Sequence, residues 1–174
     1  MVEKKKKFFE VDIPLINQKI NVFSYDLDSL QGKIIKYDLT RILKGKNVEA
    51  TIVIEKVNDQ LVGKLTGIVL TPSFIARMMR KSISYVEDSF EVNSMIIKPY
   101  MLTRKRVHRS VRRALRNETK KFICDHAKNL SHEELFHDIL SGKLQKLLAS
   151  HLKKIYPLAF CEIRVAKLKV IRKQ

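Results

Sequence analysis

The sequence predicts an α+β fold: a twisted antiparallel, partly barrel-like β-half, three helices in the C-terminal half, and a final strand that returns to the sheet. Apolar residues alternate with polar ones through much of residues 8–102, as in strands, but recur every three or four residues over 103–156, as in helices. Alternation resumes after Pro157. A strand that follows three helices needs a sheet to join, and the earlier β-half is the simplest one.

The chain has the size and composition of one folded domain. Its 174 residues are 45% hydrophobic, which is enough to build a core. A run of lysines opens the chain, so we divide it into a basic N-terminal arm at residues 1–7 and a single α+β domain at residues 8–174. No stretch approaches the roughly 20 apolar residues of a membrane span, and the lysines are not followed by the apolar segment of a secretory signal.

Strands are expected where apolar residues alternate between turn residues. We place them at residues 8–13, 20–25, 48–57, 61–70, 82–90 and 94–102, with a partly β-branched apolar segment at 33–43. Gly63 and Gly67 interrupt one of these strands, which indicates bulges or the tight curvature of a barrel corner. Pro99 favours an edge or a bulge in another, because proline lacks the N–H group that a central strand uses.

Helices are expected where the apolar spacing changes to a period of 3.6 residues. We place them at residues 72–81, 103–128, 131–141 and 143–156, before a last strand at 160–171. Thr103 has the residue type of an N-cap for the long helix, and Pro72 suits the first position of the short one. Ser131 and Glu134 have the spacing of a capping box. The alternation of the last strand shifts phase at Ala166, which predicts a bulge there.

The helix expected over 103–128 separates into two faces when it is wound at 100° per residue. Its apolar side carries Val107, Val111, Ala114, Leu115 and Phe122. Its other side carries a set of basic residues with no acid among them, which are Lys105, Arg106, Arg109, Arg112, Arg113, Arg116 and Lys120, with Arg104 just before them. Ordinary solvated faces interleave Glu and Lys so that neighbours attract, whereas these like charges repel. We therefore favour a polyanion-binding face over the alternative of a solvated one.

Arginine is the commoner cation on this face, and its planar guanidinium suits bidentate phosphate contacts. The helix at 72–81 adds Arg77, Arg80 and Lys81 on its outer side, and these join the predicted RNA-binding set. Lys4, Lys5, Lys6 and Lys7 have two open interpretations: an arm that lies on nucleic acid, or charge that only keeps the chain soluble.

The net charge predicts a partner rich in phosphate. It is +17, and it is unevenly distributed: residues 1–100 carry 16 Lys and Arg against 12 Asp and Glu, whereas residues 101–174 carry 19 against 6. The second half therefore holds most of the positive charge that would attract a polyanion.

Residues that would indicate an enzyme, a metal or a cofactor are not arranged for such chemistry. His132 and His137 flank two glutamates, but their i,i+5 spacing is one residue too long for a zinc helix. Glu118 projects onto the apolar stripe, and we expect it to pair with Arg104, His108 or Lys121, whereas His108, His126 and His151 have no obvious carboxylate partner. Cys124 and Cys161 are expected to be reduced thiols in the cytoplasm. We expect no cofactor, no metal and no catalysis.

Several stretches together resemble one family. They are residues 96–116 (IIKPYMLTRKRVHRSVRRALR), 153–170 (KKIYPLAFCEIRVAKLKV), 38–41 (DLTR) with 67–71 (GIVLT), and 80–87 (RKSISYVE). They are similar to the small-subunit ribosomal protein family of archaea and eukaryotes known as S-three-a, also named eukaryotic-type S-one. This sequence departs from the family at Phe8 and Phe9, where a Trp-Tyr-like pair is usual, and in a shortened loop between Pro14 and Leu30.

The resemblance implies a structural constituent of the small ribosomal subunit, at the platform near the mRNA exit. It implies binding to small-subunit ribosomal RNA by phosphate and shape contacts, with neighbouring small-subunit ribosomal proteins as partners and mRNA near the exit as a further candidate. It also implies a cytoplasmic location on the ribosome, no membrane and no catalysis. The alternatives from the residues themselves are a free-standing RNA-binding regulatory module and an RNA-modifying enzyme.

Overall fold

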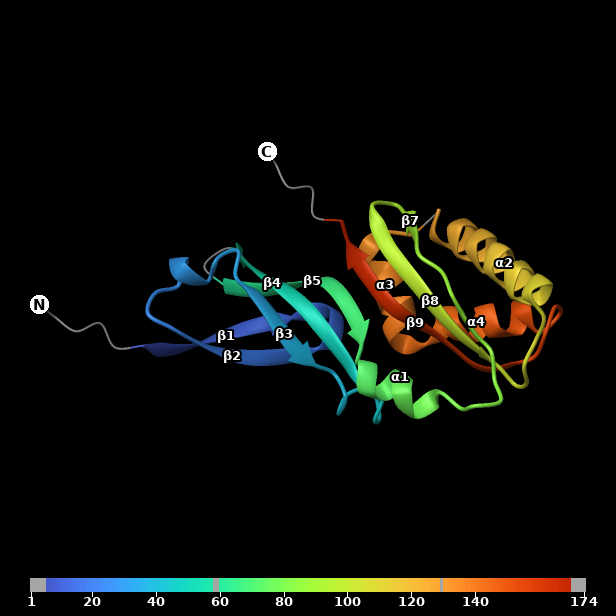
Figure 1. The fold of residues 1–174 in the computed structure, drawn as a ribbon. Helices are drawn as coiled ribbons and strands as arrows, with labels where there is room; N and C mark the ends of the chain where they lie inside the picture. Colours follow the sequence, from blue (N-terminus) through green and yellow to red (C-terminus); the bar gives the residue numbers. More distant parts are fainter. Residues whose placement is uncertain (1–5, 58–59, 129, 170–174) are drawn as a thin grey trace, which may run out of the picture.

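The structure, a computed structural model, describes residues 6–57, 60–128 and 130–169 (Figure 1). Its strands are β1 (Lys7–Ile13), β2 (Gln18–Ser24), β3 (Ile34–Asp38), β4 (Val48–Val57), β5 (Gln60–Leu70), β6 (Tyr85–Glu87), β7 (Phe90–Val92), β8 (Met95–Thr103) and β9 (Leu158–Leu168). Its α-helices are α1 (Pro72–Met78), α2 (Arg109–Ala127), α3 (His132–Ser141) and α4 (Lys143–Leu152), and Pro14–Ile16 and Asp28–Leu30 form short 3-10 turns.

Two lobes can be followed in Figure 1. The N-terminal lobe contains β1–β4 and the start of β5, and the C-terminal lobe contains β6–β9 with helices α2–α4. Strand β5 joins them because its two edges are used differently. Strand β4 pairs along one edge, whereas the other edge is shared between β1, in parallel at Leu61 and Val62, and β9, antiparallel at residues 67–69.

The strand order confirms the predicted α+β fold with a final strand that returns to the sheet. The order is β2-β1-β5-β9-β8-β6, with β3 beside β4 and β7 beside β8. Strands β2 and β3 are the two edge strands of the N-terminal lobe and do not pair with each other. The twisted sheet therefore stays open and does not close into a barrel. Among the described strand pairs, the short β1–β5 contact is the parallel one.

The two glycines of β5 have different roles: Gly63 allows close packing, and Gly67 lies at a bulge, as the sequence predicted. A Cβ atom at Gly63 would lie 2.8 Å from Ile52 Cγ2 and 2.9 Å from Ile13 Cγ1, so β1 and β4 could not pack as closely on any other residue. At Gly67 the β4–β5 register shifts, and Thr66 is the extra residue of the bulge. The bulge bends β5 where it leaves the N-terminal lobe and meets β9.

Helices α2–α4 pack around the C-terminal lobe and share its core. Leu115 and Ile123 from α2, Phe136 from α3 and Leu148 from α4 are buried in one cluster with sheet residues such as Met101. The same cluster extends into the N-terminal lobe through residues such as Ile13 and Ile52. A smaller, separate cluster in that lobe consists of Val11, Leu30, Ile54 and Leu61. The large cluster therefore fixes the position of α2 against the sheet.

The predicted elements differ from the structure in several places, among them α4, which ends at Leu152 rather than at residue 156. Residues 82–90 form two short strands, β6 and β7, instead of one, and α1 ends at Met78 rather than at residue 81. The bulge expected at Ala166 lies at Arg164 instead, opposite Pro99, where the β8–β9 register shifts. Proline cannot donate to the ladder, so the irregularity sits beside it.

The long helix also begins later than predicted, at Arg109 instead of Thr103. Thr103 is the last residue of β8 and is fully buried. Its hydroxyl group accepts a hydrogen bond from the Ser84 amide at 3.0 Å and donates one to the Lys105 carbonyl at 2.7 Å, so it is not free to cap a helix. The N-cap is His108, whose backbone is extended and whose side chain makes no capping bond.

Candidate nucleic-acid interface

Helix α2 begins with basic residues and has no acidic residue in its first turn. The sequence from Thr103 to Asn117 contains no Asp or Glu at all. Cations at a helix N-terminus oppose the macrodipole, and Arg109 and Arg113 also repel each other at i,i+4. These costs to stability are compensated when an external anion binds the same face.

The structure divides the predicted basic residues of α2 into two groups. Arg109, Arg113 and Lys120 are exposed, whereas Arg112 and Arg116 are half-buried at the side of the helix that meets the sheet. Arg116 Nε donates to the Glu87 carbonyl at 3.1 Å. Arg112 Nε is buried and has no hydrogen-bond partner among the described residues.

The two groups arise because the face of α2 that is buried in the structure is rotated about the helix axis relative to the apolar face predicted from the sequence. The buried residues of α2 are Leu115, Thr119, Ile123 and Ala127, whereas Ala114, predicted on the apolar side, is exposed. The prediction that Arg112 lies on the outer face is therefore wrong. Arg116 lies at the edge of that face, because it is half-buried but also lines a surface hollow.

The exposed side of α2 is hollowed near its N-terminus. An open hollow of about 710 Å³ is lined by Arg109, Ser110, Arg113, Ala114, Arg116 and Asn117. Small side chains at Ser110 and Ala114 leave room between the longer ones. Three guanidinium groups beside such a hollow can each donate two parallel hydrogen bonds to phosphate oxygens. This surface, which we call the arginine face, consists of Arg109, Arg113 and Arg116 with the small residues between them.

Both ends of α2 are held by residues of the C-terminal lobe. At its C-terminus, Asn93 in the β7–β8 turn donates a side-chain hydrogen bond to the Ala127 carbonyl at 2.6 Å. Before its N-terminus, Val107 N donates to Ser84 Oγ at 3.2 Å. The arginine face is therefore presented by a helix that is fixed at both ends.

A second basic group forms where the segment after β8 passes the segment after α1. Arg106 Nη2 donates to the Lys81 carbonyl at 3.4 Å, which brings the two segments together. Arg104, Lys105, Arg106, Arg80 and Lys81 are all exposed there. Arg77 is exposed as well, and its guanidinium lies 5.6 Å from the Phe74 ring centroid in a cation–π contact.

Lys6 and Lys7 lie apart from both groups. Lys6 is exposed just before β1, and Lys7 is the first residue of that strand, in the lobe opposite α2 (Figure 1). Lys4 and Lys5 lie outside the described residues. The predicted set therefore occupies separate parts of the surface, and α2 carries the densest part of it.

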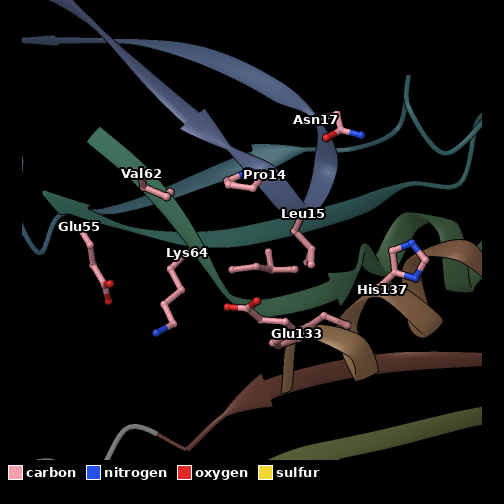
Figure 2. Close-up of a pocket in the computed structure, with 11 residues that line it drawn as sticks. Pro14, Leu15, Asn17, Glu55, Val62, Lys64, Glu133 and His137 are labelled. Carbon is pink, nitrogen blue, oxygen red and sulfur yellow. The ribbon is translucent and has the colours of Figure 1, made fainter. Parts of the chain in front are cut away.

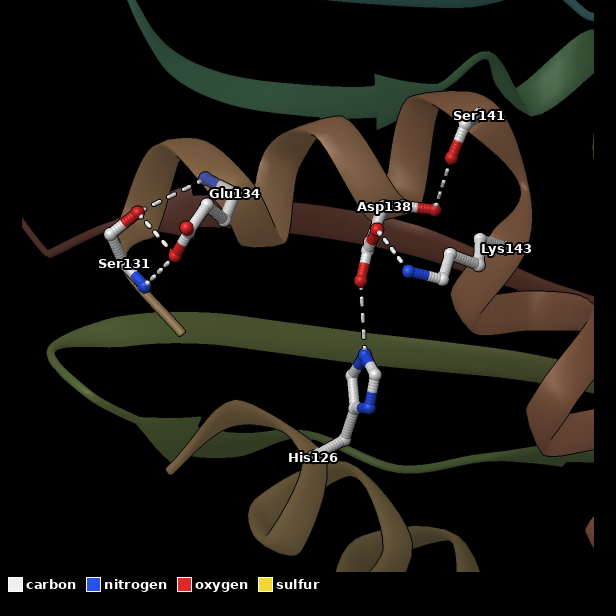
Figure 3. A network of polar contacts seen from close by, with 6 residues as sticks. All are labelled: His126, Ser131, Glu134, Asp138, Ser141 and Lys143. Carbon is white, nitrogen blue, oxygen red and sulfur yellow. Dashed lines mark hydrogen bonds and ion pairs between the residues drawn. The ribbon is translucent and has the colours of Figure 1, made fainter. Parts of the chain in front are cut away.

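Two histidine–carboxylate pairs secure α2 against the other helices, and the sequence reasoning missed both. His151 Nε2 lies 2.8 Å from Glu118 Oε1, and His126 Nε2 lies 3.1 Å from Asp138 Oδ2. Figure 3 shows Asp138 between His126 and Lys143, whose Nζ is 3.6 Å away. Glu118 and His126 are eight residues apart on α2 and therefore lie on one side of the helix. Nothing in the sequence identifies the partners of either residue on the other helices.

The Phe122 ring belongs to the same group. Its centroid lies 5.0 Å from that of His151 and 6.2 Å from that of His126. The hydrogen bond from His151 lowers the pKa of Glu118, and the charges of Lys121, His151 and Lys154 lower it further. Of the three partners predicted for Glu118, Lys121 is close enough to act as a charge. The hydrogen-bond partner of Glu118 is His151, which was not predicted. Figure 3 also shows the predicted capping box of α3, in which Ser131 and Glu134 bond reciprocally.

A separate hollow of about 510 Å³ lies between β5 and α3 (Figure 2). Glu55, Lys64, Glu133 and His137 are among its lining residues. Across the described ranges, no group of three His, Cys, Asp or Glu side chains is placed to hold a metal ion, and this hollow is no exception. Over the same residues, every helix is too short or too polar to cross a membrane.

The open α+β sheet and the arginine face define a class: basic α+β proteins with a fixed, arginine-rich helix at the surface. The chain belongs to the Ribosomal S3Ae family, whose model matches residues 3–174. It is 25% identical to the small ribosomal subunit protein eS1 of Nanoarchaeum equitans, over 92% of this chain and 87% of the relative. It is 24% identical to the protein of that name from Saccharolobus islandicus, over 95% and 85%, and from Staphylothermus marinus, over 97% and 85%.

Proposed function

We propose that this protein is a structural constituent of the small ribosomal subunit and binds small-subunit ribosomal RNA by phosphate and shape contacts. Membership of the Ribosomal S3Ae family supports this role, as do relatives that are named small ribosomal subunit protein eS1. The observation that carries the RNA-binding part is the arginine face of α2, with its guanidinium groups around an open hollow. The role is structural, and no reaction is assigned to the chain.

The geometry of α2 explains how such binding would work. Residues four apart on a helix rise by about 6 Å, so Arg109 and Arg113 can contact different phosphates of one backbone. Their guanidinium groups read charge and shape and not base sequence, as is usual for folded RNA. The half-buried Arg116 is positioned by its bond to the Glu87 carbonyl, so it loses less side-chain entropy when it binds.

The proposal includes a place on the subunit and a set of neighbours. We infer the platform near the mRNA exit, with neighbouring small-subunit ribosomal proteins beside it, mRNA within reach at the exit, and a cytoplasmic location as part of the ribosome. The basis for these finer statements is the family resemblance of residues 96–116 and 153–170. Crosslinking within purified subunits, followed by sequencing of the attached RNA, tests them. Crosslinks confined to RNA far from the mRNA exit would contradict the platform position.

A free-standing RNA-binding regulatory module is the alternative, and one experiment separates the two. The full chain is expressed with an affinity tag, and its distribution on a sucrose gradient is measured at moderate salt. A ribosomal constituent sediments with small subunits in stoichiometric amount and stays there as salt rises. A regulatory module appears mainly in the light fractions, and that result would overturn the proposed function.

A further inference from the structure

An exposed aromatic surface lies on the β1–β2 hairpin, in the lobe away from α2 (Figure 1). Phe8 is 73% exposed, Phe23 52% and Tyr25 50%. Phe8 and Phe23 face each other across the two strands, and their ring centroids are 4.8 Å apart. Adjacent large rings left in water indicate a binding surface more often than isolated exposed apolar residues do.

The strand alternation explains why these rings share one side of the hairpin. Val11 and Val22 turn towards the small core of the N-terminal lobe, so residues of the opposite parity turn outward. Lys6 is on the same side, and its Nζ lies 5.7 Å from the Phe23 centroid and 5.1 Å from the Tyr25 centroid. We call Lys6, Phe8, Phe23 and Tyr25 the aromatic platform.

We propose that the aromatic platform stacks an unpaired RNA base, while Lys6 contacts a phosphate beside it. This deepens the proposed function, because it rests on RNA being the ligand. Aromatic side chains next to a cation are the usual means of holding single-stranded nucleic acid, since every base has a face that can stack. The rings differ in function from the arginine face, which offers hydrogen bonds and charge but no ring.

The surroundings of the platform favour RNA over an apolar protein partner. On the same side of the hairpin its neighbours are Asn21 and an ion pair of Glu10 with Lys19, at 2.7 Å. An apolar docking surface would continue into aliphatic side chains, whereas this one is bounded by polar groups. The Glu10 carboxylate is paired with Lys19, which offsets its repulsion of a phosphate.

The test measures binding of the full chain to two RNA probes: a single-stranded oligonucleotide of about eight nucleotides, carrying 2-aminopurine at its centre, and a duplex of equal length. Three variants are compared with the unchanged chain: Phe8→Ala with Phe23→Ala, Phe8→Leu with Phe23→Leu, and Ile34→Ala. Ile34 is a matched control because it is an apolar side chain, 68% exposed, on β3. Phe→Leu keeps an apolar side chain but removes the ring, so it remains informative if the alanine variant folds poorly.

We expect the ring-deleted variants to bind the single strand about tenfold more weakly or worse, since stacking contributes a factor of that size per base. Quenching of 2-aminopurine should be lost, and affinity for the duplex and the salt dependence should stay unchanged. Lys6→Gln should lower the salt slope by somewhat less than one unit. Ile34→Ala should behave like the unchanged chain.

Other outcomes overturn the proposal in recognisable ways. Unchanged single-strand affinity of the leucine variant shows that no base stacks there, and the arginine face can still bind RNA. If that variant also sediments poorly with small subunits, the platform binds a protein neighbour instead. If the ring-deleted variants lose affinity equally for the single strand and the duplex, the substitutions act through the fold or the charge of the protein and not through base stacking. If the unchanged chain binds neither probe nor the subunit, the proposed function fails as well.

Discussion

The hydroxyl group of Thr103 lies 3.0 Å from the Ser84 amide and 2.7 Å from the Lys105 carbonyl, in a fully buried position. This contact joins the end of β8 to the segment before β6. It also sets the path of the three cations that precede α2, because the chain turns there before Arg109. The position of a basic surface therefore depends on a neutral, buried residue.

Replacing Thr103 by valine should destabilise the fold by about 2 kcal/mol, because the Ser84 amide and the Lys105 carbonyl lose their partner while the shape is kept. Thr103→Ser is the matched control, since it retains the hydroxyl group. Urea denaturation followed by circular dichroism measures the difference. A valine variant as stable as the serine variant would show that water satisfies these groups and that the contact does not hold the segment.

The single-domain prediction can be tested by ending the chain before β9. Strand β9 pairs with both β5 and β8, so a chain that ends at Pro157 should lose its cooperative unfolding transition. A chain that ends at Lys169 keeps the whole strand and should unfold as the full chain does. Thermal scans of all three distinguish the cases. An intact transition in the shorter chain would mean that the N-terminal lobe folds as a separate domain.

The Glu118–His151 contact should make stability depend on pH. Because the folded-state pKa of Glu118 is lowered from 4.5, chiefly by the hydrogen bond to His151, its contribution is present above that pH and disappears as pH falls through the lowered value. Glu118→Gln should therefore be less stable than the unchanged chain at pH 5.5, and the difference should shrink as the pH falls below about 4, which is near the ordinary range of a glutamate. Glu49→Gln controls for the loss of one exposed negative charge. A difference that stays constant over this range would contradict the prediction.

Cys161 should react slowly with thiol reagents in the folded protein. Burial, with a smaller effect of the neighbouring Glu162 charge, raises the pKa of its thiol to about 12, so the reactive thiolate is scarce near pH 8. Replacing Cys124 by serine leaves Cys161 as the single cysteine of the chain. The rate of modification should then be low in buffer and rise strongly in urea. Equal rates in the two conditions would show that the thiol is accessible and ionised.

Features encoded over short stretches of sequence could be predicted. The β4–β5 hairpin follows from alternation, the α3 capping box from the spacing of Ser131 and Glu134, and the bulge in β5 from its glycines. Even the return of β9 follows from a simple requirement, since an alternating strand needs a neighbour. Each of these features depends on residues close together in the chain or on one general rule of packing.

Features that depend on distant partners could not be predicted. The predicted start of α2 was wrong. Thr103 has a residue type that is common at helix N-caps, but its hydroxyl group accepts a hydrogen bond from the amide of Ser84, nineteen residues earlier. The burial of Arg112 depends on how α2 lies on the sheet. His151 and Glu118, 33 residues apart, meet only because α4 packs beside α2. Helical periodicity places residues on faces, but tertiary packing decides which face is buried.

We propose above that the arginine face of α2 binds RNA phosphates. Arg109→Glu with Arg113→Glu changes two exposed residues, so the core should be spared. Folding stability should hold or rise slightly, because acidic residues near the N-terminus suit the helix dipole and relieve repulsion. Lys33→Glu with Lys36→Glu is the matched control: it changes the net charge by the same amount at exposed positions around β3.

The decisive measurement is a salt titration of binding to small-subunit ribosomal RNA by the unchanged chain and these two variants. The arginine variant should bind at least about 100-fold more weakly at moderate salt, because it loses two charge-assisted contacts that contribute about 1.5–3 kcal/mol each. Its salt slope should fall by about 1.5 units, since each phosphate contact contributes roughly 0.7–0.9. The lysine variant should keep the original slope. Equal slopes for the arginine variant and the unchanged chain would contradict the claim and place the RNA-binding surface elsewhere on the molecule.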